Sequence, residues 1–363
     1  METQVALVSA QPMPTLILAF QREPERVVLM TTDEMKGNAI FLKNVFNPKG
    51  IKVAIVPVAS YDIQKIRDSV ARVINDYDNV ALNVTGGTKV MALGAFLEFS
   101  ERKLPIFYVD MKFGLIRNLT DNSMAPLRGR VSLKEYLMAH GFYVESSEGL
   151  REVIPRKKIV SILAKTLTKM PGRITNWNHL FHYYTPHDNG NMGVESADRD
   201  LRDVFESLAL ESVGNLEKGR YTCDEEMRKY FLGGWLEDYV FLEVNALKPD
   251  SLAKNVVVSW ESPGKNKIKN EFDILFTHNF KLYYISCKTS NITGGHEHSK
   301  EAIYELDALR DRIAGLFGKA MLATVRKLGE ADFTRAKRMG VAVVQGKDLA
   351  NLRSMIASWI KSR

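Results

Sequence analysis

The first third of the chain alternates between short, continuously apolar runs and segments whose apolar residues recur at helical spacing. The apolar runs predict buried strands at residues 5–8, 27–30, 53–56, 80–84 and 106–109. The intervening segments predict helices at residues 13–20, 39–45, 63–74 and 90–99. Strands alternating with helices are typical of a parallel sheet of Rossmann type, whose ligands bind beyond the carboxyl ends of the strands. We therefore expect an α/β domain over residues 1–130.

The middle of the chain has a different pattern. Between residues 131 and 220, apolar residues recur with helical spacing, as in Ile159, Ile162 and Leu163, which predicts a helical connector. Residues 184–191 predict a loop, because they are rich in helix-breaking residues. The basic run at residues 156–158 is typical of a solvated face, and we assign no chemistry to it.

The last third, residues 221–363, predicts a second α/β domain. A helix is expected at residues 225–246, although Gly233 and Gly234 lie inside it and are costly there unless another backbone approaches closely. Two runs rich in aromatic and β-branched residues, 272–277 and 281–287, flank turn chemistry at His278 and Asn279, which predicts a β-hairpin. A loop at 291–298, a helix from residue 299, strands at 320–325 and 340–344 and a helix at 332–338 complete an α-β-β-β-α-β order.

Composition places the chain among ordinary two-domain globular proteins. It has 363 residues, of which 45% are hydrophobic and 26% charged, and no apolar run approaches the length of a membrane-spanning helix. The N-terminal residues lack the pattern of a signal peptide, so we expect a cytoplasmic protein. Cys223 and Cys287 are too few for a disulfide framework and are expected to be reduced. The net charge of +7 permits a polyanionic partner without requiring one.

The predicted hairpin carries residues with metal and phosphate chemistry. Because side chains alternate along a strand, Glu271, Asp273 and Leu275 are expected on one side of the first strand. Tyr284, Ser286 and Lys288 are expected on one side of the second. An aspartate and a lysine that converge at one sheet edge suit phosphodiester hydrolysis, because a carboxylate binds Mg²⁺ or Mn²⁺ and an ammonium stabilises developing negative charge. A half-buried hairpin with a solvated lysine is the alternative.

Asp273 followed by Ser286-Cys287-Lys288 resembles the PD-(D/E)xK nuclease core, in which an aspartate is followed by Glu-x-Lys on the next strand. The sequence departs from that motif at Ser286, where the family has glutamate. The resemblance covers residues 221–345 and implies a restriction-endonuclease-like fold. It also implies that a helix before the sheet supplies a glutamate to the metal, and Glu237 occupies that position. An exposed helical glutamate is the alternative for Glu237.

If the domain is a nuclease, another carboxylate has to replace the missing glutamate, because a neutral serine hydroxyl is a poor ligand for the metal. Some restriction enzymes of the superfamily carry Ser-x-Lys and take the acid from the following helix, about a dozen residues beyond the lysine. Residues 289–300 separate Lys288 from Glu301, so the resemblance makes Glu301 the first candidate ligand and Glu305 the reserve. Stabilisation of a helix N-terminus is the alternative role for Glu301. Glu237 and Glu271 are the remaining candidates.

A second motif follows the strand predicted at 80–84, where Thr85-Gly86-Gly87-Thr88-Lys89 leads into a helix. Glycines allow a sharp turn, and helix N-terminal amides with threonine hydroxyls and a lysine can receive a phosphate. A plain strand-to-helix connection is the alternative.

Residues 83–91, together with the segment from Ser9 to Pro12 after the first strand, resemble the CRISPR-associated Rossmann fold, CARF, over residues 1–130. The resemblance implies a homodimer that binds cyclic oligoadenylate. Carried onto this sequence, its ligand residues are Ser9, Gln11, Thr85, Gly86, Gly87, Thr88 and Lys89, with Thr31, Thr32 and Asp33 as weaker candidates.

Together, the two resemblances indicate a CARF sensor at residues 1–130, a connector at 131–220 and a PD-(D/E)xK domain at 221–363. This is the architecture of CRISPR ancillary nucleases activated by cyclic tetra-adenylate. The implied properties are a need for Mn²⁺ or Mg²⁺, catalytic roles for Asp273, Lys288, Glu237 and Ser286, and metal ligation by Asp273, Glu301 and Glu271. The implied substrate is single-stranded RNA or DNA, or duplex DNA that is nicked. A non-catalytic sensor that only binds nucleic acid, and a Rossmann enzyme that acts on a small nucleotide, remain as alternatives.

Overall fold

The computed structural model describes residues 2–169, 171–182, 185–186, 192–196, 198–260, 268–289, 300–308 and 318–362. The chain divides into two compact units. One comprises residues 1–144 with 259–268, and the other comprises 145–258 with 269–363. The loop predicted at 291–298 and most of the loop predicted at 184–191 lie outside the described residues. Within those residues, no helix is long and apolar enough to cross a membrane.

The first unit contains a seven-stranded sheet in the order β3-β2-β1-β4-β5-β6-β7. Its strands are β1 (Thr3–Leu7), β2 (Arg26–Thr31), β3 (Lys52–Pro57), β4 (Val80–Asn83), β5 (Ile106–Asp110), β6 (Leu115–Asn118) and β7 (Met124–Pro126). The five strands predicted from the apolar runs are confirmed, and they pair in parallel. The strands β6 and β7, which the apolar pattern did not predict, extend the sheet in antiparallel fashion.

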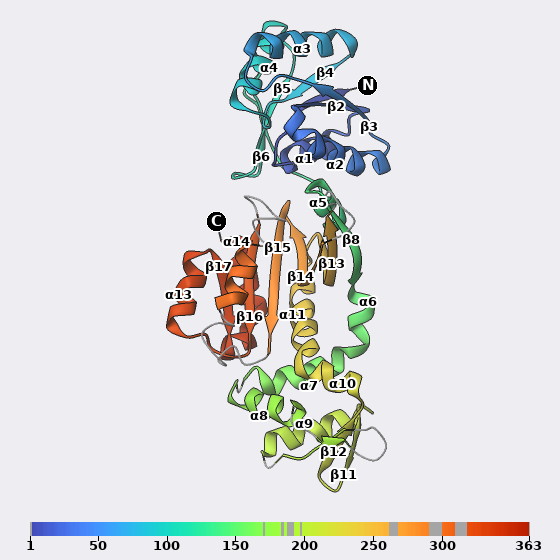
Figure 1. Cartoon of the computed structure of the whole chain (residues 1–363), viewed down its shortest axis with the longest axis vertical. Helices are drawn as coiled ribbons and strands as arrows, with labels where there is room; N and C mark the ends of the chain where they lie inside the picture. The colour runs from blue at the N-terminus through green and yellow to red at the C-terminus, as the bar shows by residue number, and fades with distance from the viewer. Residues whose placement is uncertain are drawn as a thin grey trace. The chain divides into compact units, whose positions relative to one another are not determined.

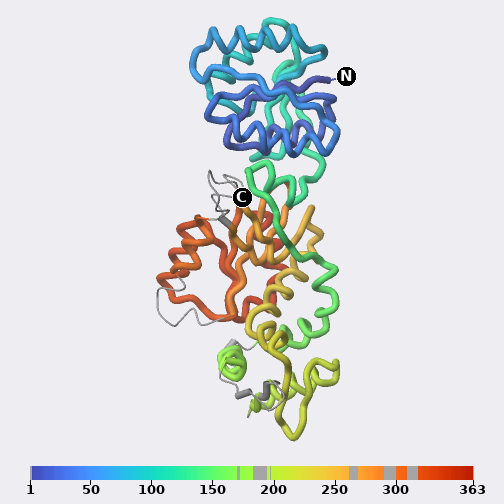
Figure 2. Tube along the Cα trace, turned by 45° about the vertical axis from the view of Figure 1, so that its right-hand side comes forward, coloured from blue at the N-terminus to red at the C-terminus, as the bar shows by residue number. Residues whose placement is uncertain are grey.

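Helices cover both faces of this sheet, as Figures 1 and 2 show. They are α1 (Met13–Arg22), α2 (Lys36–Phe46), α3 (Ile63–Asp76), α4 (Lys89–Glu101) and α5 (Leu133–Ala139), with short 3-10 turns at Asp33–Met35 and Asn47–Lys49. The helices α3 and α4 lie on one face, where Ile66, Val70 and Met91 pack against Val5 and Leu82. The helices α1 and α2 lie on the other face. Two covered faces explain why the parallel strands carry continuous apolar runs instead of alternating apolar and polar residues.

The second unit is built on a six-stranded sheet in the order β17-β16-β15-β14-β13-β8. Its strands are β8 (Phe142–Glu148), β13 (Ser251–Trp260), β14 (Ile268–His278), β15 (Lys281–Lys288), β16 (Lys319–Thr324) and β17 (Val341–Gln345). The predicted hairpin is confirmed, because β14 and β15 pair in antiparallel fashion from His278–Lys281 to Ile274–Ile285. The turn lies one residue later than expected, at Asn279 and Phe280, whose φ angles of 49° and 62° suit a two-residue hairpin turn. The strands β15, β16 and β17 run parallel.

One face of this sheet packs against α11 (Trp235–Asn245) and α14 (Leu352–Lys361). Ile274, Ile285 and Met321 of the strands share a core with Val240 of α11 and Ile356 of α14. The single helix expected at 225–246 is interrupted, because α10 (Glu225–Lys229) is joined to α11 by a π-helical turn at Tyr230–Gly234. The other predicted helices are present as residues 300–308 and α13 (Glu330–Arg338), and a 3-10 segment, Gly346–Asn351, precedes α14.

The expectation that the connector is purely helical is wrong. Helical spacing correctly predicts α7 (Lys157–Leu167), α8 (Pro171–His182) and α9 (Arg199–Leu210), which follow α6 (Leu150–Val153) and a 3-10 turn at Ile154–Arg156. However, β8 belongs to the six-stranded sheet, and β9 (Thr185–Pro186), β10 (Met192–Val194), β11 (Asn215–Glu217) and β12 (Arg220–Cys223) form a separate four-stranded sheet. The strands β9 to β12 are too short to show a two-residue alternation.

Candidate functional site

The carboxylate of Asp273 is fixed by the strand beside it. Beyond the regular pairing of β14 with β15, the amide of Cys287 donates to Asp273 Oδ2 at 2.7 Å, and the hydroxyl of Ser286 donates to the same oxygen at 3.0 Å. The side chain therefore accepts a bond that a backbone carbonyl accepts in an unbroken ladder. Within the described residues, no group donates a hydrogen bond to Oδ1. The carboxylate is thus held through one oxygen and can offer the other to a ligand.

The strand alternation expected around Asp273 is interrupted at Phe272. Leu275 is the register partner of Tyr284, so these two side chains share a face. Phe272 packs edge-to-face against Tyr284 with ring centroids 5.0 Å apart. Phe272 therefore lies on the side of Leu275. Regular alternation does not allow this, so the backbone takes an irregular step between residues 272 and 275, where the Asp273 carboxylate replaces a ladder acceptor.

Glu237, in the first turn of α11, lies close enough to Asp273 for the two carboxylates to influence each other. The Glu237 side chain is 24% exposed. Burial raises the pKa of Glu237, the Lys254 ammonium lowers it, and the negative charge of Asp273 raises it again. Two neighbouring carboxylates of this kind are a typical environment for a divalent cation. The structure therefore brings together Asp273, Ser286 and Glu237 from the predicted set.

A buried ionic cluster supports Glu237, and the sequence did not reveal it. Asp238 is fully buried and accepts hydrogen bonds from Lys254 Nζ at 2.6 Å, from Tyr230 Oη at 3.0 Å and from Arg156 through Nε at 2.6 Å and Nη2 at 3.2 Å. The Lys254 ammonium also lies 3.3 Å from Glu237 Oε2. The interpretation of residues 156–158 as a solvated face is therefore wrong for Arg156. Lys254, which lies among the apolar residues of β13, was the signal in the sequence that could have revealed this cluster.

Lys288 ends β15 at the same edge of the sheet. It is half-buried, and its register partner on β16 is Thr324. No carboxylate of the described residues forms an ion pair with its ammonium, which leaves the charge available to an anion. The neighbouring Cys287 is buried, and desolvation raises the pKa of its thiol well above the usual value, so it is an inert core residue.

The other candidate acids are more exposed. Glu271 is exposed on β14, and Glu301 and Glu305 are exposed on the helix at 300–308, whose Ile303 and Leu306 are buried. Burial raises the pKa of Tyr284, and the charges of Asp273 and Glu305 contribute to this shift, so Glu305 also borders this face of the hairpin. In the described part of the chain, no group of three or more His, Cys, Asp or Glu residues is arranged to hold a metal.

In the first unit, the predicted ligand loops lie at the point where the strand order reverses. The strand β1 pairs with β2 on one side and with β4 on the other, and the loops after β1 and β4 follow adjacent carboxyl ends. A Cβ on Gly86 would lie 2.1 Å from the carbonyl oxygen of Leu7, and Gly87 has a φ of +74°. Both glycines are therefore required for the loop to pass so close to β1.

The hydroxyls of this loop are partly engaged by the protein. Thr88 caps α4 by accepting a bond from the amide of Met91 at 3.1 Å, and it donates to the carbonyl of Ser60 at 2.7 Å. Its single hydroxyl proton is therefore in use. Thr85 Oγ1 accepts a bond from the amide of Val109 at 2.8 Å and keeps its own proton to donate. Lys89 is exposed in the first turn of α4.

Polar groups after β1 and β2 lie at the same end of the strands. The Ser9 hydroxyl and the amide of Gln11 are 3.3 Å apart in a local turn. Gln11 Oε1 and Thr32 Oγ1 are buried and have no hydrogen-bond partner among the described residues. Thr31 is buried, and its hydroxyl donates to the carbonyl of Thr32 at 3.0 Å, whereas Asp33 is exposed. Unpartnered oxygens at a strand end are expected where a ligand completes the bonding.

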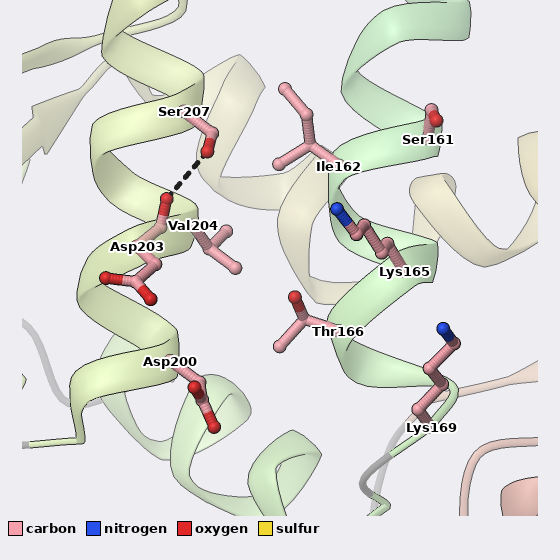
Figure 3. A pocket seen from close by; sticks show the side chains of 9 residues that line it. All are labelled: Ser161, Ile162, Lys165, Thr166, Lys169, Asp200, Asp203, Val204 and Ser207. Atoms are coloured by element: carbon pink, nitrogen blue, oxygen red, sulfur yellow. Dashed lines mark hydrogen bonds between the residues drawn. The ribbon is translucent and has the colours of Figure 1, made fainter.

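A hollow of about 520 Å³ lies between α7 and α9. Figure 3 shows Lys165 of α7 and Lys169, just after that helix, in it together with Asp200 and Asp203 of α9. Charges of both signs line the hollow, so it does not favour a polyanion. None of the predicted site residues lines it.

Family models of known proteins match the N-terminal and the C-terminal part of the chain separately. Residues 3–136 match the family model of the Card1 CARF domain, and residues 224–363 match that of the Card1-like endonuclease domain. No curated protein matches the chain.

Solved structures match over nearly the whole length. The structure of Can2 from Sulfobacillus thermosulfidooxidans in complex with cyclic tetra-adenylate is similar with a TM-score of 0.82 and 25% identity, covering 99% of this chain and 97% of the other. Protein VC1899 from Vibrio cholerae has a TM-score of 0.87 and 22% identity, with 99% and 98% covered. A type III CRISPR defence DNA nuclease activated by cyclic oligoadenylate has a TM-score of 0.58 and 18% identity, covering 90% of this chain and 46% of the other.

Proposed function

The chain belongs to the CRISPR-associated CARF nucleases, and we propose that it is a metal-dependent endonuclease switched on by a cyclic oligoadenylate. Its substrate is single-stranded RNA or DNA, or duplex DNA that it nicks, in type III CRISPR defence. The observation that carries the proposal is the Asp273 carboxylate, held by Ser286 and Cys287 beside Glu237 within the endonuclease domain. The Lys288 ammonium at the same edge, which pairs with no carboxylate of the described residues, supports it.

The donor set fits a hard divalent cation such as Mg²⁺ or Mn²⁺, because it consists of carboxylate oxygens. Asp273 would bind the ion through Oδ1, and Glu237 would contribute the second carboxylate. A bound ion would polarise the scissile phosphate and lower the pKa of an attacking water. Lys288 stabilises the negative charge that develops on the phosphate oxygens. Ser286 orients Asp273 through the 3.0 Å hydrogen bond rather than by ligating the ion.

The position occupied by glutamate in related nucleases is Ser286 here, so the charge of the centre comes from elsewhere. Glu237 has the strongest support, because its pKa responds to Asp273. Glu301, Glu305 and Glu271 remain candidates for a further ligand. Changing each acid separately to glutamine and measuring cleavage at saturating Mn²⁺ ranks them. If the variants of Glu301, Glu305 and Glu271 all cut at the parental rate, Glu237 is the acid that replaces the family glutamate.

For the sensor domain, we propose cyclic tetra-adenylate as the activator, as in the Can2 complex. The amides of Gly86 and Gly87, the hydroxyl proton of Thr85 and the exposed ammonium of Lys89 would receive phosphates. Ser9 and the buried Oε1 of Gln11 would bind another part of the ring, and Thr88 keeps its structural role as the cap of α4. Two chains would share the ligand as a homodimer. Binding activates the nuclease only if the ligand prefers the state in which the nuclease domains are aligned.

Cleavage of labelled single-stranded RNA, single-stranded DNA and supercoiled duplex, with and without cyclic tetra-adenylate and Mn²⁺, tests the proposal. Asp273→Asn removes the fixed charged ligand, so cleavage is expected to fall at least about 100-fold while the activator affinity stays unchanged. Full-rate cleavage by this variant would remove Asp273 from the centre.

A second function, nucleic-acid binding without cleavage, has one observation in its favour. Ser286 replaces the family glutamate, and within the described residues no cluster of three acidic, histidine or cysteine ligands is present. Activator-dependent binding of nucleic acid without any cleavage by the parental protein would establish this alternative.

A further inference from the structure

The chain leaves β16 directly beside the strand that carries Lys288. Lys288 and Thr324 are register partners, and the amide of Val325 donates to the carbonyl of Lys288 at 3.3 Å. Val325 packs in the same buried cluster as Cys287. Arg326, the next residue, is half-buried at the same end of the sheet as Lys288.

The backbone that presents Arg326 is held by two side chains. The amide of Arg326 donates to Thr324 Oγ1 at 3.3 Å, and the amide of Leu328 donates to Gln345 Oε1 at 2.8 Å. Gln345 ends β17, the next parallel strand. The segment that carries Arg326 is therefore tied to two neighbouring strand ends.

The guanidinium of Arg326 has no counter-ion among the described residues. Within the part of the chain that the structure describes, its side chain forms neither a hydrogen bond nor an ion pair, and its Nε is buried without an acceptor. Burial lowers the pKa of Arg326, and no carboxylate offsets that effect. Three other arginines of the second unit differ, since bidentate pairs with carboxylates join Arg156 to Asp238, Arg228 to Glu225 and Arg353 to Glu243.

A half-buried cation without a partner costs free energy, so its position calls for an anion supplied from outside. A planar guanidinium matches the oxygens of a phosphodiester better than a lysine does. Lys327, next in sequence, is exposed and adds positive charge at the same place. We propose that Arg326 binds a backbone phosphate of the nucleic-acid strand that lies across the Asp273–Lys288 edge. The inference rests on the proposed function, because it assumes that nucleic acid occupies this edge.

Arg338 provides a matched control. It is an exposed arginine in the last turn of α13, shortly before β17 begins at Val341. Val341 pairs with Ala320, whereas Gln345 pairs with Thr324, so Arg338 lies at the opposite end of the parallel strands from Arg326. Removing either arginine changes the net charge equally, and only Arg326 adjoins the proposed site.

The test measures binding and cleavage separately. Parental protein, Arg326→Ala, Arg326→Lys and Arg338→Ala are each prepared with and without Asp273→Asn, as full-length chains. Fluorescence anisotropy of a labelled 20-nucleotide single strand, as DNA and as RNA, gives Kd between 50 and 300 mM salt for the Asp273→Asn proteins, with cyclic tetra-adenylate present. Steady-state cleavage with Mn²⁺ gives kcat and KM for the others.

We expect Arg326→Ala to raise Kd and KM about tenfold, because hydrogen bonds to a charged group are lost, while kcat changes less than about twofold. The slope of log Kd against log salt is expected to fall by about 0.7, the value of one phosphate contact with a single strand. Arg326→Lys should keep the slope and recover part of the affinity. Arg338→Ala should behave like the parental protein. A change confined to thermal stability does not produce this change in salt dependence.

Three outcomes overturn the inference: unchanged Kd and salt slope in Arg326→Ala, an equal loss in Arg338→Ala, or a loss confined to kcat. The binding arm also separates the inference from the proposed function. A parental protein that binds but never cleaves contradicts the nuclease proposal while still testing Arg326. A parental protein that binds neither strand overturns both.

Discussion

Replacing Lys254 with methionine removes a cation that two carboxylates of α11 share. The Lys254 side chain is 3% exposed, and its ammonium lies 2.6 Å from Asp238 Oδ1 and 3.3 Å from Glu237 Oε2. Removing one partner of a buried ion pair costs about 3–5 kcal/mol, because the other charge remains desolvated. Asp238 keeps its bonds to Arg156 and Tyr230 in this variant. The loss of unfolding free energy should therefore lie at the lower end, at about 3 kcal/mol.

A double-mutant cycle tests this reasoning without assuming the energy of a single contact. Lys254→Met, Asp238→Asn and the double variant are unfolded in urea, and tryptophan fluorescence follows the transition. All four tryptophans lie between residues 177 and 359, so the signal reports on the part of the chain that contains the nuclease. The coupling energy should be about 2 kcal/mol, within the range measured for residues in direct contact. Calorimetric titration with cyclic tetra-adenylate checks that the sensor is unaffected.

Two results would refute the argument. A loss below about 1 kcal/mol in Lys254→Met would mean that water already reaches the ammonium. Additive single effects would mean that Lys254 and Asp238 do not depend on each other.

Three further predictions concern the two sites and one half-buried histidine. Gln11→Ala and Lys89→Ala should each weaken cyclic tetra-adenylate binding about tenfold in calorimetry. If both variants bind it with the affinity of the parental protein, the placement of the ligand is contradicted. Ser286→Glu should raise Mn²⁺-dependent cleavage if the centre has decayed and lower it if Ser286 is needed to orient Asp273, so an unchanged rate contradicts both accounts. Burial lowers the pKa of His140 to about 4 from 6.5, so its neutral form stabilises the fold above pH 6.5. Up to about 3 kcal/mol of that contribution is lost as the pH falls to 4. Urea unfolding followed by circular dichroism should show the loss in the parental protein but not in His140→Phe, and parallel pH curves would argue against it.

The central strands of both sheets could be predicted from the sequence because they are buried on both faces. Residues 27–30 and 80–82 are continuously apolar for that reason, and the order of the strands and helices indicated the fold class. The strand β7 is exposed at every residue, so no apolar pattern marks it. The strands β9 to β12 are also too short to show periodicity. Prediction therefore failed where a strand is defined by its neighbours rather than by its own burial.

The candidate site was predicted only in part, for a related reason. Asp273 and Lys288 were found from their spacing around a hairpin, which is local information. The cluster of Asp238, Lys254 and Arg156 joins α11, β13 and the start of α7, so no short motif contains it. Buried charges have to be paired, but the sequence does not say with which partner.

Gly233 and Gly234 illustrate the same limit. The sequence showed that glycines destabilise a helix at these positions, but it did not show the structural reason for them. The expected cause was a second backbone, but a Cβ on Gly234 would instead lie 2.9 Å from Cδ2 of the Tyr230 ring. Because Gly234 has no Cβ, the Tyr230 ring can lie close to the π-helical turn, and its hydroxyl donates to Asp238 at 3.0 Å. The glycine therefore contributes to the ionic cluster beside Glu237.

The π-helical turn also links the helix that carries Glu237 to the strand that carries Lys288. Within the turn, the carbonyl of Phe231 accepts a bond from Trp177 Nε1 at 2.9 Å, and the carbonyl of Leu232 accepts one from the hydroxyl of Thr289. Thr289 directly follows Lys288. Both donors are distant in sequence from the turn. Through the bond from Thr289, the turn attaches the helix that carries Glu237 to the end of the strand that carries Lys288.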